Sequence, residues 1–264
     1  MMDATAKPHG SIWLARLCLL LGAGSIVMAL VGAVGAGQDW WDKLNGLSAV
    51  FAAAVVALLG FVFSLIVLLL YRKKGQAIRN LTLIGLVCSV AFLGFIGYWA
   101  NVGRSVPQIH DITTNLDNPP QFQVLKLRPD DFADIPGRGE PKYAGMDAME
   151  RWKVLHRGAY GDLKTVTIDL PVDRVVTLAA EIALERGWEV ALTKPDEGRV
   201  EAVDTVSLFR FKDDVVIRVQ PGPGGLSSEV DVRSVSRVGR SDLGVNAKRI
   251  RSFLSDLQAA ADKG

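Results

Sequence analysis

Three long apolar stretches occupy most of the first hundred residues and constrain the fold more than any other feature. They run over residues 12–36, 47–71 and 78–99. Each reaches the roughly 20 residues that a helix needs to cross a hydrocarbon core about 30 Å thick. The second stretch has no charged residue, and Arg16 and Arg79 sit near the starts of the other two, where they can snorkel to the headgroups. The sequence therefore predicts three transmembrane helices and the lipid bilayer as a partner.

The first stretch has an alternative interpretation as a cleaved signal peptide. Lys7 and Arg16 could form its basic region, and residues 33–36 include small side chains suited to cleavage. Signal peptides have apolar cores of only about 7–15 residues, so we favour an uncleaved helix. Both alternatives leave the orientation of the later segments unchanged.

The charges of the two connecting loops predict the orientation of the chain. The first loop, about residues 37–46, carries Lys43 against Asp39 and Asp42. The second loop is strongly basic, with Arg72, Lys73, Lys74 and Arg79. Because basic loops stay in the cytoplasm, we expect the chain after Asn101 to lie on the non-cytoplasmic side.

The part after Asn101 holds almost all other charges, and they are mixed in sign, since the whole chain has a formal net charge of only +2. This balance gives no basic field for nucleic acid, so we predict no nucleic-acid partner. Cys18 and Cys88 both fall inside apolar stretches. The later part therefore has no cysteine for a disulfide, a catalytic thiolate or a cysteine-based zinc site.

We predict three regions: an anchor over residues 1–102, an extended docking segment over 103–163 and an α+β domain over 164–264. The middle region mixes apolar residues with many prolines and glycines, which favours an extended segment that docks on the domain or the membrane surface. One short helix is plausible over residues 146–155.

Hydrophobic periodicity and turn residues predict the order β-α-β-β-β-β-α for the third region. Pro171 begins the first helix and Gly187 ends it, and Ser241 or Asp242 can cap the last helix. The expected strands cover residues 166–170, 188–193, 199–205, 213–220 and 229–238. Short connections between the last four strands imply an antiparallel meander, covered on one face by two helices. The fold class is a two-layer α+β sandwich behind three transmembrane helices.

Several motifs of this region resemble a bacterial family known as domain of unknown function 1499. They lie at residues 211–219, 230–244 and 246–250, and residues 111–114 and 118–122 also resemble the family. The resemblance implies a multi-pass protein of the bacterial inner membrane with a periplasmic C-terminal domain. It implies no activity, and it supplies no catalytic residues.

A cluster of arginines and serines joins the last strand to the last helix and is the candidate anion- or headgroup-binding site. It consists of Arg233, Ser234, Ser236, Arg237, Arg240, Ser241 and Asp242. The N–H groups and dipole of a helix N-terminus attract anions, and arginines strengthen such sites. The structural alternative is that Ser241 or Asp242 caps the helix and that the arginines pair with Asp204, Asp213 and Asp214.

No catalytic, metal or cofactor site is predicted. Asp213 and Asp214 are adjacent on one strand and point to opposite faces, so they cannot easily act as a pair. His110 and His156 show no metal-ligand spacing, and no Walker loop, nucleophile elbow or dinucleotide motif occurs.

These observations favour a non-enzymatic envelope module that binds a membrane or periplasmic protein, a lipid or a small anion. One alternative is a hydrolase or transferase that acts on envelope material through Asp204 or Asp214. A second alternative is a structural subunit of a membrane complex.

Overall fold

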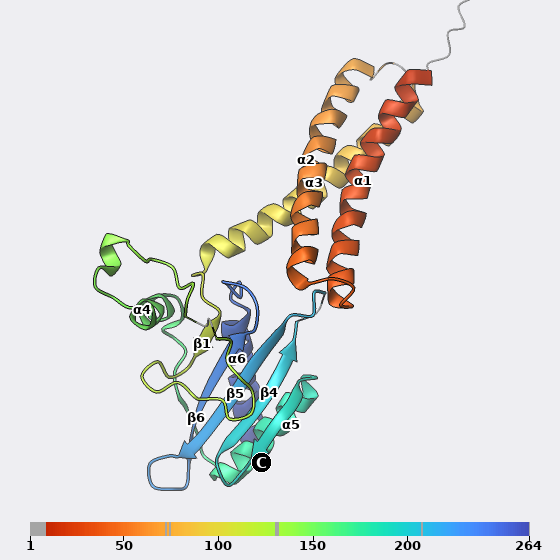
Figure 1. Cartoon of the computed structure of the whole chain (residues 1–264). Coiled ribbons are helices and arrows are strands. Elements are labelled where there is room, and N and C mark those ends of the chain that lie inside the picture. Colours follow the sequence, from red (N-terminus) through yellow and green to blue (C-terminus); the bar gives the residue numbers. More distant parts are fainter. Residues whose placement is uncertain (1–8, 72, 74, 130–131, 207, 264) are drawn as a thin grey trace, which may run out of the picture. The chain divides into compact units, whose positions relative to one another are not determined.

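A computed structural model describes residues 9–71, 73, 75–129, 132–206 and 208–263. The chain forms two compact units, one of residues 1–101 with 208–210, the other of residues 102–207 and 211–264. The first unit contains the long apolar helices α1 (His9–Gly37) and α2 (Lys43–Tyr71) and most of α3 (Gln76–Ser105). All three are long and apolar enough to cross a membrane, which confirms the three predicted spans (Figure 1).

Glycines allow the helices of the anchor to approach each other closely. A side chain at Gly22 would overlap the backbone of Gly85 on α3, and one at Gly32 would overlap Ala49 on α2. Gly24, in contrast, faces open space. Helix association in lipid depends on van der Waals packing, so these contacts help to hold the three helices together.

The second unit is an antiparallel sheet with helices, as predicted from the sequence. Its strands are β1 (Asp111–Thr113), β2 (Val166–Ile168), β3 (Glu189–Lys194), β4 (Arg199–Thr205), β5 (Lys212–Pro221) and β6 (Ser228–Ser236). Its helices are η1 (Pro141–Tyr143), α4 (Ala148–Tyr160), α5 (Val172–Glu185) and α6 (Val245–Ala261). The strand order is β1-β6-β5-β4-β3, and β2 also pairs with β6. The predicted meander of the last four strands is therefore confirmed.

The structure differs from the prediction at three elements. β1 was not expected, because three residues among turn formers give no periodic signal. α4 continues to Tyr160, beyond the expected residues 146–155. α6 begins at Val245 rather than at Ser241 or Asp242, because Leu243 and Gly244 adopt left-handed backbone conformations that delay the first turn.

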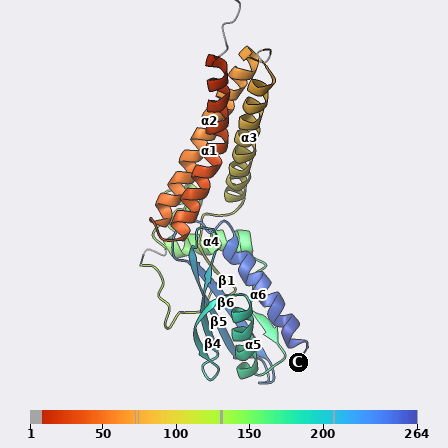
Figure 2. The same ribbon diagram turned by 90° about the vertical axis from the view of Figure 1, so that its right-hand side faces the viewer.

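The two faces of the sheet are covered in different ways. Helices α5 and α6 pack on one face, which we call the helix face, and bury the main apolar core (Figure 2). This core includes alternate residues of the central strands, among them Val215, Ile217, Val230 and Val232. Residues 114–128, which we call the strap, cross the opposite face without regular secondary structure. We call that side the strap face.

Candidate functional site

A buried ion pair fixes the start of the second unit to its last strand. Arg233 on β6 donates hydrogen bonds from Nε and Nη2 to the two carboxylate oxygens of Asp111 on β1, at 2.9 and 2.6 Å. Both side chains are almost completely buried. A third nitrogen of Arg233 donates to the carbonyl oxygen of Pro120 in the strap. The bidentate geometry satisfies the charge that burial would otherwise penalise.

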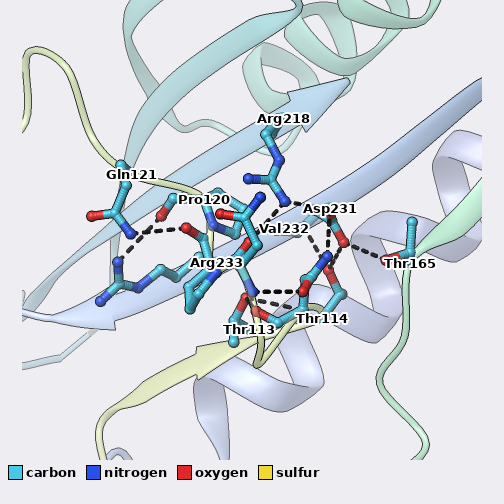
Figure 3. A network of polar contacts seen from close by, with 12 residues as sticks. Thr113, Thr114, Pro120, Gln121, Thr165, Arg218, Asp231, Val232 and Arg233 are labelled. Atoms are coloured by element: carbon cyan, nitrogen blue, oxygen red, sulfur yellow. Dashed lines mark hydrogen bonds and ion pairs between the residues drawn. The ribbon is translucent and has the colours of Figure 1, made fainter. Parts of the chain in front are cut away.

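A second network surrounds Asp231, two residues earlier on the same face of β6 (Figure 3). Its carboxylate accepts hydrogen bonds from the hydroxyls of Thr114 and Thr165, at 3.0 and 2.6 Å. It also accepts from Asn115 and pairs with Arg218 of β5 at 2.7 Å. One buried carboxylate of β6 therefore joins the strap, the residue before β2 and the neighbouring strand β5.

Charged side chains of the strap face hold the strap through its backbone atoms. Both carboxylate oxygens of the fully buried Glu201 accept hydrogen bonds from the successive backbone N–H groups of residues 123, 124 and 125. Arg218 donates to the carbonyl oxygen of Asn118, and Arg199 donates to that of Gln121. An irregular segment cannot satisfy its own backbone groups, so the sheet supplies the missing partners.

The helix face contains one polar network inside its apolar core. Arg249 of α6 donates to Asp204 at 2.7 Å and to Asp213 at 2.6 Å. It also donates to Ser234 and Asn246, and Asn246 in turn contacts Ser236 and the carbonyl oxygen of His110. The network therefore fixes α6 on three neighbouring strands.

The structure separates the predicted anion-site residues between the two faces and the loop after β6. Arg233 lies on the strap face, whereas Ser234 and Ser236 lie on the helix face. The remaining four residues belong to residues 237–244, which we call the β6–α6 loop. The cluster is thus not one continuous surface, and the anion site stays a prediction for the loop residues.

Within the β6–α6 loop the two arginines differ in how tightly they are held. Arg237 donates to both carboxylate oxygens of Asp214 at 2.7–3.0 Å, and this ion pair raises the pKa of the arginine. Arg240 lies 3.6 Å from Asp134, and its side chain is 64% exposed. Arg240 is therefore the loop cation with more freedom to meet an external anion.

Asp242 stabilises the start of α6 even though it lies outside the helix. Its carboxylate accepts hydrogen bonds from the backbone N–H groups of Gly244 and Asn246, at 2.9 and 2.8 Å. Burial raises its pKa, because few water molecules reach the charge. Ser241 accepts from the N–H of Leu243. These contacts correspond to the capping role that the sequence analysis gave as the structural alternative.

The three candidate aspartates each pair with an arginine. Asp204 and Asp213 contact Arg249 on the helix face, whereas Asp214 contacts Arg237. The predicted opposite orientation of Asp213 and Asp214 is confirmed by these contacts. As a result, Asp214 does not share a site with Asp204 and Asp213, which both contact Arg249.

His156 of α4 is buried beside β1 rather than placed in a ligand set. Its Nε2 accepts a hydrogen bond from the backbone N–H of Thr113 at 3.1 Å, and burial lowers its pKa to about 4. Its ring lies between those of Trp152 and Tyr160, both at 5.7 Å. Burial also raises the pKa of Tyr160 to about 12. Among the described residues, no group of three His, Cys, Asp or Glu side chains could hold a metal ion.

The residues that organise these networks have only a weak signal in the sequence. Glu201, Asn246 and Arg249 are ordinary polar positions of a strand and a helix when read alone. The only available signal was their place in alternating patterns, where Glu201 interrupts a run of small apolar residues, Val200, Ala202 and Val203. A buried charge in such a run indicates a partner, but it does not say which one.

Comparison with known proteins places this second unit in a family. A search of curated proteins finds no match at a significant level. The family model described as "Protein of unknown function (DUF1499)" matches residues 111–257, which is more than half of the chain. The match begins at the first residue of β1 and ends within α6, so it includes the charged residues of the polar networks on both faces of the sheet. The chain is therefore a member of the DUF1499 family that carries three apolar, membrane-spanning helices before the family domain.

Proposed function

We propose that this protein is an envelope module that acts by binding rather than by catalysis, with its family domain on the periplasmic side of the inner membrane. The observation that carries the proposal is the use of the buried charges. Asp111, Asp231, Glu201, Arg233 and Arg249 all hold one part of the domain to another. Because these buried charges hold the fold together, the surface loops are the part of the domain whose contacts with other molecules can change.

The geometry of the aspartates argues against the hydrolase or transferase alternative. General acid–base catalysis needs carboxylates within reach of one bond of the substrate. Asp204 lies 2.7 Å from Arg249, and Asp214 lies 2.7 Å from Arg237 on the opposite face. Each of these carboxylates already has an arginine as its partner, and the two do not face a common substrate position.

Cell-based complementation distinguishes the two possibilities. A strain that lacks the protein is complemented with Asp204→Asn or with Asp214→Asn, and membrane levels of each variant are matched to the wild type. If the protein is a binding module, both variants should restore the wild-type phenotype to this strain. Loss of function with one of them, at normal protein level, would favour the enzymatic alternative.

The proposed orientation rests on the basic loop between α2 and α3 and on the nearly neutral loop before it. Alkaline phosphatase fused after residue 264 should be active, because this enzyme folds only outside the cytoplasm. Green fluorescent protein at the same position should stay dark when exported in the unfolded state. The reverse pattern would place the domain in the cytoplasm.

The binding role itself is tested with the whole chain. A pull-down from native membranes in mild detergent, with crosslinking before extraction, should recover partners that depend on the domain. A partner present at constant ratio in all conditions would favour the alternative of a structural subunit. Partners that change with growth conditions would support a binding module.

A further inference from the structure

The β6–α6 loop lies in space beside residues 103–109, by which the chain enters the second unit. The last turn of α3 and the residues after it contact this loop directly. The Cδ2 atom of Leu243 lies 3.3 Å from the point where a side chain at Gly103 would begin, and Val106 lies similarly close to Gly244. The backbone N–H of Asp242 also donates to the carbonyl oxygen of Ile109.

The side chains at this end of the sheet have the composition of a membrane-contacting surface. Val238 and Leu243 are 40% and 39% exposed, although both are large and apolar. Arg237 and Arg240 lie in the same loop, with side chains 41% and 64% exposed. The acidic residues that face them are Asp214, which is buried, and Asp134, which is 25% exposed. Positive charge therefore dominates the exposed part of the loop. Apolar side chains among cations are the pattern by which soluble segments lie on an anionic bilayer, with the side chains in the interface and the cations at the phosphates.

We propose that the β6–α6 loop docks on the surface of the bilayer in which its own anchor is embedded, and that it prefers anionic phospholipids. Val238 and Leu243 enter the headgroup region, and Arg240 contacts lipid phosphates. This inference deepens the proposed binding function by naming its ligand. It does not depend on which side of the membrane the domain occupies.

The test uses the full chain in lipid nanodiscs, with Cys18→Ala and Cys88→Ala to remove the native thiols. A nitroxide is attached at Val238→Cys, and the matched control is Leu226→Cys in the β5–β6 loop, at the other end of the sheet and 84% exposed. We expect collisions of the first label with an aqueous nickel reagent to fall severalfold when phosphatidylglycerol is added to phosphatidylcholine. The control label should be unaffected.

A charge variant sharpens the test without labels in the loop. Arg240→Gln should lower the ratio of docked to undocked domain by about fivefold in anionic nanodiscs, the effect expected for one surface arginine. Arg174→Gln on α5, an exposed arginine near the opposite end, should change nothing. High salt should reduce the difference between the two lipid compositions.

Hydrogen exchange of the unmodified chain tests the inference without any variant that could fail to fold. Amides of residues 237–244 should exchange several times more slowly in anionic than in neutral nanodiscs, whereas residues 222–227 should not. Equal exchange and equal accessibility at both ends would overturn the inference. If a protein partner is still recovered in the pull-down, the proposed binding function stands without the lipid contact.

Discussion

The layers that cover the two faces of the sheet satisfy their backbone hydrogen bonds in different ways. On the helix face, α5 and α6 satisfy their own backbone hydrogen bonds, so the strands below them are mostly apolar, apart from the network around Arg249. On the strap face, the covering segment has no regular structure, and its N–H and C=O groups need partners. Glu201, Arg199, Arg218 and Arg233 supply those partners. Alternate residues of one strand are therefore mostly apolar where helices cover them and charged where the strap covers them.

The largest expected effect tests whether charge really holds the strap face. Arg233→Met removes the buried partner of Asp111 and should cost about 3–5 kcal/mol of unfolding free energy, because one buried carboxylate is left unpaired. Hydrogen exchange of β6 amides in the detergent-solubilised chain measures this. Adding Asp111→Leu to the same chain should recover most of the loss. A cost below about 1 kcal/mol for the single variant would show that the pair contributes little.

The next effect concerns His156, which connects α4 to β1 at the edge of the strap face. Its neutral ring accepts from Thr113, and its pKa falls from 6.5 to about 4 on folding. The unfolded chain therefore binds the proton more readily. The contribution of the neutral His156 ring to the unfolding free energy is fully present above pH 6.5. It decreases as the pH falls toward 4, by up to about 3 kcal/mol.

The matched variant for this pH effect is His156→Gln, whose amide oxygen can accept the same hydrogen bond without titrating. Between pH 7 and pH 4 the wild type should lose more unfolding free energy than the variant does. The comparison removes the contribution of all other titrating groups. Parallel pH curves for the two proteins would contradict the assignment to His156.

A smaller effect distinguishes local opening of the strap from unfolding of the whole domain. Glu201→Gln keeps the shape of the side chain but replaces one acceptor oxygen with an amide, so the three strap N–H groups lose part of their bonding. We expect a cost of about 2 kcal/mol. The residues 123–125 should exchange faster while β5 keeps its protection. The control on the helix face is Ile250→Val, which should cost about 1 kcal/mol without faster exchange confined to the strap.

The contrast between the faces also explains what the sequence could predict. Val230 and Val232 alternate with polar residues, and α5 has a clear apolar stripe, so the helix face and the meander were visible as periodic patterns. The three apolar stretches were visible for the same reason. The same alternation puts Glu201 and Asp231 on the face opposite the core, but it does not identify their partners, which lie far away in the chain. The residues of the candidate anion site are close in the sequence but are divided between two faces and a loop, because adjacent strand residues point to opposite faces, and the site stays a prediction.

The smallest effect tests the cap of α6, where the helix face ends at the β6–α6 loop. Asp242→Ala removes the acceptor of two N–H groups and should cost about 1 kcal/mol, a typical value for a lost helix cap. Asp242→Asn should cost less, because it keeps an acceptor and removes a charge whose burial is unfavourable, as the raised pKa indicates. Hydrogen exchange at residues 245–248 measures both. Since α6 is held mainly by apolar contacts, its middle should keep full protection in either variant, and a loss there would mean that polar contacts hold the helix face as they hold the strap face.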